Sequence, residues 1–107
     1  MDVTSSMPPG SPLPPSPVPD ATLVRRIVER DATALIELQR RYQGSLYAQV
    51  YGILMDGEHA ERVVTRAFEQ LWHAAMWLRH GRPKPFTWLQ QTAASLARAE
   101  RTALQSR

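Results

Sequence analysis

A short basic segment with aromatic residues on both sides carries the clearest chemical signal in this 107-residue sequence. Residues 79–85 form the segment, which Trp77 precedes and which Phe86 and Trp88 follow. Its basic side chains are Arg79, His80, Arg82 and Lys84. Cations neutralise phosphates and aromatic rings stack on unpaired bases. The segment therefore predicts a surface for single-stranded or locally melted nucleic acid, with Trp77 as the exposed ring and Trp88 placed in the core by its helical spacing.

The other reactive groups form no catalytic or metal-binding pattern. The chain has no cysteine, which excludes disulfides, thiolate zinc sites and cysteine nucleophiles. Its three histidines are scattered, and it has no Gly-rich phosphate loop or nucleophile elbow. Glu58 and Glu61 share a helix face near a helix N-terminus, where they complement the helix dipole. We therefore predict no enzyme activity, no cofactor and no metal site.

Positive charge is concentrated in the last third of the chain. Residues 70–107 carry six basic residues and one acidic residue, whereas residues 21–69 carry seven of each. Residues 1–20 carry two acidic residues and no basic one. An anionic partner would therefore meet the C-terminal third first.

Length and composition fit one small domain. No apolar run approaches the ~20 residues that cross a bilayer, and the N-terminus has no signal-peptide pattern. We expect a cytoplasmic protein without a membrane contact.

Seven of the nine prolines fall between Pro8 and Pro19, and no aromatic residue occurs before Tyr42. Residues 1–19 are expected to be a disordered Pro/Ser-rich arm with polyproline II character.

From residue 20 onward the apolar spacing predicts an all-α domain over residues 20–104, a compact bundle of four helices. Asp20 and Asp31 are the expected N-caps of the first two helices. Residues 55–57 should separate the second helix from the third, and Pro85 should begin the fourth. The expected core positions are Leu23, Val24, Ile27, Val28, Leu35, Leu38, Tyr42, Leu46, Val50, Ile53, Ala60, Val63, Val64, Ala67, Phe68, Leu71, Trp72, Trp88, Leu89, Thr92, Ala93, Leu96 and Ala97.

Three blocks of residues have an order and spacing typical of one protein family. They are Asp20-x-x-Leu23-Val24-x-x-Ile27-x-x-x-Asp31-x-x-Ala34-Leu35-x-x-Leu38-x-x-x-Tyr42, Ala60-Glu61-x-Val63-Val64-x-x-Ala67-Phe68-x-x-Leu71-Trp72 and Phe86-x-Trp88-Leu89-x-x-x-Ala93. Together they resemble region 2 of the bacterial sigma-70 family of RNA polymerase sigma factors, of the extracytoplasmic-function type. The resemblance covers residues 20 to about 102, and region 4 is missing.

This resemblance implies a role in transcription initiation. The second and third helices would dock on the β′ clamp helices of core RNA polymerase, and the following loop and fourth helix would open the promoter −10 element and capture a flipped base. By position, the polymerase-facing residues would be Arg62, Thr65, Arg66 and Glu69. The residues facing promoter −10 DNA would be Trp77, Arg79, His80, Arg82, Lys84, Gln91, Ser95 and Arg98.

The sequence departs from the family pattern on the polymerase-facing side. Arg62, Thr65 and Arg66 stand where the family usually has an acidic residue, a glutamine and an acidic residue. Because the clamp helices are basic, the two arginines would replace attraction with repulsion. The expected function is a sigma factor-like initiation module. The alternatives are a degenerate sigma-like module that binds an anti-sigma factor or a separate region 4 partner without binding DNA, and a small basic nucleic-acid binder unrelated to sigma factors.

Overall fold

Four α-helices make up the part of the chain that the computed structural model describes, residues 18–80 and 83–106. They are α1 (Asp20–Val28), α2 (Ala32–Leu54), α3 (Gly57–Leu78) and α4 (Pro85–Gln105). The described residues contain no strand, so the predicted all-α class and the number of helices are confirmed. Of the arm expected at residues 1–19, all but the last two residues lie outside the described ranges.

Local side-chain chemistry sets the boundaries of α2 and α3. Asp31 is the N-cap of α2, and its carboxylate accepts a hydrogen bond from the backbone N–H of Thr33 at 3.0 Å. Asp56 caps α3 in the same way, accepting from the N–H of His59 at 2.9 Å. Met55 ends α2 in the left-handed region, with φ 54°. These caps satisfy helix-end donors that have no partner inside the helix.

The start of α1 differs from the expectation. Pro19, not Asp20, occupies the N-cap position, and no side chain caps the helix there. Asp20 is the first residue of α1, and its carboxylate accepts hydrogen bonds from Arg41 and Tyr42 of α2. The prediction of Asp20 as an N-cap was wrong because the carboxylate binds the Arg41 guanidinium, a contact in which both partners are charged.

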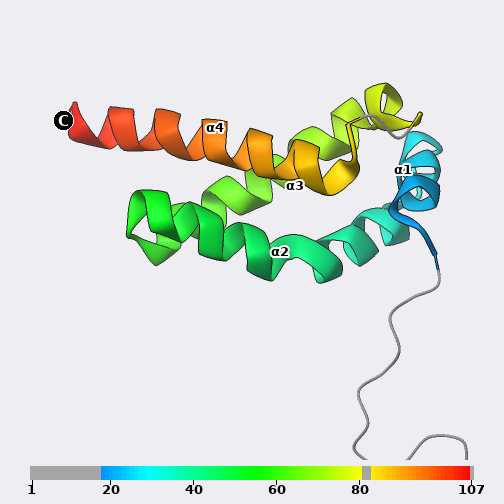
Figure 1. Ribbon diagram of the computed structural model, residues 1–107, viewed down its shortest axis with the longest axis horizontal. Helices are drawn as coiled ribbons and strands as arrows, with labels where there is room; N and C mark the ends of the chain where they lie inside the picture. Colours follow the sequence, from blue (N-terminus) through cyan, green and yellow to red (C-terminus); the bar gives the residue numbers. More distant parts are fainter. Residues whose placement is uncertain (1–17, 81–82, 107) are drawn as a thin grey trace, which may run out of the picture.

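The three long helices run alongside one another in alternating directions (Figure 1). Helix α3 returns antiparallel to α2, and α4 returns antiparallel to α3. The short α1 lies at one end of the bundle, beside the turn between α3 and α4, and the C-terminus lies at the opposite end. None of the helices in the described ranges has both the length and the apolar character needed to span a bilayer.

All four helices contribute to one apolar core, and no polar or charged residue in the described part of the chain is fully buried. Of the expected core positions in α2, Leu38, Leu46 and Val50 are buried. Leu35, Tyr42 and Ile53 are half-buried and pack against the core. The buried residues are Leu23, Val24, Ile27, Ala34, Leu38, Leu46, Val50, Ala60, Val63, Val64, Ala67, Phe68, Leu71, Ala75, Leu78, Leu89, Ala93 and Ala97.

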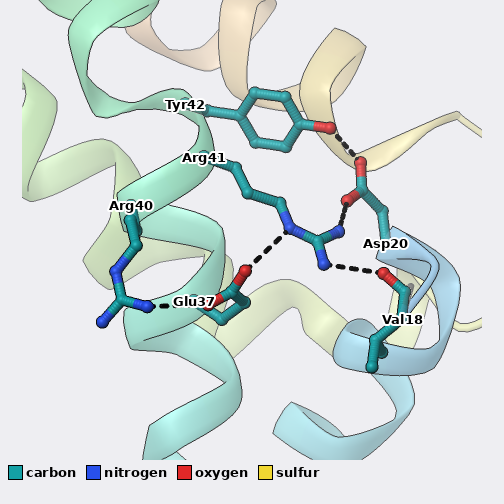
Figure 2. A network of polar contacts seen from close by, with 6 residues as sticks. All are labelled: Val18, Asp20, Glu37, Arg40, Arg41 and Tyr42. Carbon is teal, nitrogen blue, oxygen red and sulfur yellow. Dashed lines mark hydrogen bonds and ion pairs between the residues drawn. The ribbon is translucent and has the colours of Figure 1, made fainter. Parts of the chain in front are cut away.

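A polar network joins α1 to α2 (Figure 2). The Arg41 guanidinium donates to the carboxylates of Asp20 at 2.6 Å and Glu37 at 3.1 Å, and to the carbonyl of Val18 at 2.7 Å. The Tyr42 hydroxyl also donates to Asp20. Burial, and then this hydrogen bond, raise the pKa of Tyr42 to about 12, so the phenol keeps its proton and remains a donor. The network fixes the entry of the chain into the bundle.

Candidate nucleic-acid interface

An exposed ring and three exposed basic side chains lie around the turn between α3 and α4. Trp77 near the end of α3 is 80% exposed. Arg79, His80 and Lys84 are also exposed, and the Arg79 Nε–H donates to His80 Nε2 at 3.3 Å. We call these four residues the tip. Among the described residues, no carboxylate forms an ion pair with Arg79 or Lys84. The tip therefore offers cationic donors and an aromatic face to solvent.

One of the predicted DNA-facing residues, Arg82, lies outside the described residues, as does its neighbour Gly81.

A groove between α3 and α4 contains two of the predicted DNA-facing residues. It has a volume of about 270 Å³ and is lined by Gln70, Trp88, Gln91, Thr92, Ser95 and Leu96. We call it the α3–α4 groove. Amide and hydroxyl groups both donate and accept hydrogen bonds, which suits the edges of bases, and an indole face suits stacking. Arg98 is exposed and follows Gln91 by seven residues, so it continues the same face of α4 beyond the groove.

Helical periodicity connects the groove to the tip. Gln70 and Trp77 are seven residues apart, close to two turns, so they share a face of α3. Gln70 is the α3 residue that lines the groove. Because α3 runs towards the tip and α4 runs away from it, Trp77 lies on the same side of α3 as Gln70 but closer to the tip. Those predicted DNA-facing residues that the structure describes thus lie in two neighbouring parts of one surface. Gln70 was not predicted, although its spacing from Trp77 was visible in the sequence.

Two of the rings that flank the basic segment are partly occupied by packing. Phe86 is half-buried and stacks on Tyr42, with ring centroids 4.5 Å apart and an interplanar angle of 18°. Its ring face is therefore occupied by Tyr42. Trp88 is half-buried, since it packs against the core and also lines the groove. Trp72, expected in the core, is half-buried beneath the Arg30 guanidinium, which lies 5.0 Å from its ring centroid.

Contacts along its length hold α4 in place. Near its start, Phe86 stacks on Tyr42 of α2. In its first half, the Gln90 carbonyl accepts a hydrogen bond from the Gln49 amide of α2 at 3.0 Å. Towards its end, Glu100 Oε2 lies 3.6 Å from Nε2 of His59 in α3. The face that carries Gln91 and Ser95 is thus presented by a helix that is held near both ends.

The four predicted polymerase-facing residues share the outer face of α3. Arg62, Thr65, Arg66 and Glu69 are exposed and line one shallow hollow with Glu58 and Glu61. We call these six residues the α3 outer face. None of its charged residues forms an ion pair within the described part of the chain.

A second hollow, of about 420 Å³, adjoins the α3 outer face. Glu61 and Thr65 line both hollows, and the second continues onto α2 through Gln43, Gly44 and Tyr47, with Val64. Tyr47 stacks on Tyr51, which is 41% exposed. The α3 outer face and Tyr47 of α2 therefore belong to two hollows that share Glu61 and Thr65.

Within the described ranges, no three His, Asp or Glu side chains come together as metal ligands. Comparison of the chain with protein-family models, with curated proteins and with solved structures finds no match.

Proposed function

We propose that this chain is a sigma region 2-like module that binds single-stranded nucleic acid through the tip and the α3–α4 groove. The observation that carries the proposal is the 80% exposure of Trp77 beside Arg79 and Lys84, which form no ion pair with an acidic residue in the described ranges. An exposed ring next to unpaired cations matches the two interactions a single strand provides, base stacking and phosphate contact.

The α3–α4 groove gives the proposed surface a second role. Gln70, Gln91 and Ser95 offer donors and acceptors, and Trp88 offers part of its ring. A base turned out of the strand would meet these groups next to the tip. The resemblance to sigma region 2 supports the same location, and it specifies the ligand as the melted non-template strand of a promoter −10 element.

Core RNA polymerase is the protein partner that the resemblance implies, with the α3 outer face as the contact. The shared exposure of Arg62, Thr65, Arg66 and Glu69 on one side of α3 supports an interface there. Its charge differs from the family pattern, because Arg62 and Arg66 lie at its centre. Docking on basic clamp helices would leave these two arginines facing like charges, which weakens such an interface.

A titration of dye-labelled non-template DNA at low and moderate salt, followed by fluorescence anisotropy, tests the DNA-binding proposal. We expect binding at low salt, and we expect log Kd to rise linearly with the logarithm of the salt concentration. Lys84→Gln should weaken binding and lower that slope by about 0.7, the contribution of one phosphate contact to a single strand. Arg40→Gln is the matched control, since Arg40 is an exposed arginine of α2 outside the tip and the groove. Absence of binding by the unmodified chain at low salt would contradict the proposal.

A second candidate is a protein-interaction module that binds an anti-sigma factor or a region 4 partner and no DNA. The exposure of Tyr51 (41%) and Met55 (70%) at the end of α2 favours it, since exposed apolar side chains are typical of protein interfaces. Co-purification with a region 4 protein encoded beside this chain tests it. The complex should tolerate Lys84→Gln and be lost in Met55→Asp, and the chain alone should bind no oligonucleotide.

A further inference from the structure

A hollow at the junction of α1 and α3 adjoins the tip. It has a volume of about 270 Å³ and is lined by Arg25, Val28 and Glu29 of the α1 end and by Arg79 and His80 of the tip. Figure 1 shows the reason, since α1 lies across the end of the bundle where α3 turns into α4. The side chains of two arginines from distant parts of the sequence therefore line one small space.

Arg25 differs from the other two arginines near the end of α1. Arg26 forms an ion pair with Asp31 at 2.8 Å. Arg30 donates to the backbone carbonyl of Trp72 at 2.8 Å and lies over its ring. Arg25 donates only to the hydroxyl of Thr22, at 3.1 Å, among the contacts of the described residues. Its remaining donors are free for a ligand.

Two of the side chains that line the hollow, Arg25 and Arg79, suit a phosphate group. A guanidinium donates two parallel N–H bonds to phosphate oxygens, and such charge-assisted bonds are among the strongest polar contacts. Glu29 is the one acidic residue of the lining, and it pairs with neither Arg25 nor Arg79. Both α1 and α3 end here, and cations near a helix C-terminus also stabilise the helix. This interaction with the helix dipole favours arginines at the ends of α1 and α3, but it occupies none of their hydrogen-bond donors.

We propose that Arg25 and Arg79 together hold a backbone phosphate of the bound strand, so that the nucleic-acid surface continues from the tip onto α1. This inference rests on the proposed function. It adds to that function an element, α1, which neither the charge distribution nor the resemblance assigned to DNA. The strand would then run from the α3–α4 groove across the tip to the end of α1.

Two substitutions test the proposal with the same dye-labelled oligonucleotide, one that removes a positive charge from the hollow and one that removes a negative charge. Arg25→Gln should weaken binding about twofold to fivefold, the range of an exposed ion pair, and should lower the salt slope by about 0.7. Glu29→Gln removes the carboxylate from the same hollow and should tighten binding by a similar factor. Arg40→Gln should change neither quantity. Urea unfolding of each variant separates an effect on binding from an effect on the stability of α1.

The possible outcomes distinguish this inference from the proposed function. If Arg25→Gln binds as the unmodified chain does while Lys84→Gln binds more weakly, the phosphate site on α1 is refuted and the DNA-binding proposal stands. If Arg25→Gln and Arg40→Gln weaken binding equally, the effect is one of net charge and the site is refuted as well. If the unmodified chain binds no oligonucleotide, both proposals fail.

Discussion

The ring of Tyr42 stacks on the ring of Phe86 at a centroid distance of 4.5 Å, and this contact holds the first turn of α4 against the middle of α2. The Tyr42 hydroxyl also donates to Asp20, so one side chain joins α1, α2 and α4. Because α4 begins directly after Lys84, the stack sets the position of the segment that leaves the tip.

Phe86→Ala should lower the free energy of unfolding by about 2–3 kcal/mol, less than the cost at a fully buried phenylalanine because Phe86 is half-buried. Urea unfolding followed by circular dichroism measures the loss. Thr87→Ala, at the exposed neighbouring position, should stay within about 0.5 kcal/mol. Equal stability of the two variants would show that the stack contributes nothing.

Two adjacent arginines of α2 provide a matched test of the polar network. The Arg41 side chain is 19% exposed and contacts three groups, whereas the Arg40 side chain is 75% exposed and contacts Glu37 alone, at 3.3 Å. Arg41→Met should cost about 1–3 kcal/mol of unfolding free energy, because it leaves the Asp20 carboxylate without its cation. Arg40→Met should cost less than about 1 kcal/mol. The prediction fails if the two losses, measured by urea unfolding, are alike.

Trp77→Ala should reduce affinity for single-stranded DNA at least about fivefold, the contribution of one stacked base, without changing stability. Anisotropy titration and urea unfolding measure the two effects. Phe86→Ala should lower stability, which Trp77→Ala leaves unchanged, since the Phe86 ring packs on Tyr42. Unchanged affinity in Trp77→Ala would remove stacking from the proposed mechanism.

The capping carboxylates give the stability a pH dependence. Hydrogen bonds from Thr33 and then Arg26 lower the pKa of Asp31, and those from the backbone and ring of His59 lower the pKa of Asp56. The native state then binds fewer protons than the unfolded chain, so this stabilisation is complete above about pH 5 and is lost as the pH falls through the lowered pKa values.

Asp31→Asn and Asp56→Asn keep a capping side chain and remove the charge, so both should flatten the acid limb of stability against pH. Urea unfolding between about pH 6 and pH 2.5 measures that limb. Glu58→Gln serves as a control, because Glu58 is exposed and lies beside the cap without forming an ion pair. An unchanged slope in both Asp variants would contradict the assignment.

On the α3 outer face, the proposed polymerase contact, replacing Arg62 and Arg66 by Glu should strengthen binding to core RNA polymerase, because it would remove like charges facing the basic clamp helices that the resemblance implies. Surface plasmon resonance with immobilised core enzyme measures the change. Arg98→Glu changes the charge of α4 instead and is expected to leave this binding unaltered. Weaker binding by the Arg62 and Arg66 variant would show that the α3 outer face meets an acidic partner.

Local patterns predicted the helices well because capping and apolar spacing act over a few residues. Asp31 caps α2 and Pro85 begins α4, as predicted, and α2 ends before Met55, the first residue of the predicted break. Asp20 was misassigned because its partner, Arg41, belongs to another helix and no local pattern reveals such a contact.

The same limit applies to the candidate site. The exposure of Trp77 was predicted from its position beside the basic segment. Arg25 and Arg79 line one hollow, and Gln70 and Gln91 line one groove, because of how the helices pack, so only the fold shows these neighbours. Phe86 was expected beside the loop, and its contact with Tyr42 likewise arises from tertiary packing.

The attachment of α4 near both ends has a consequence for the entropy of binding. Phe86 and Gln90 hold its first half to α2, and Glu100 lies against His59 of α3. A groove wall that is already ordered loses little conformational freedom when a ligand settles on it, so more of the contact energy appears as affinity. Removing the contact between Glu100 and His59 should therefore weaken the proposed binding of a ligand in the groove at Gln91 and Ser95. Glu100 itself lies outside the lining of that groove.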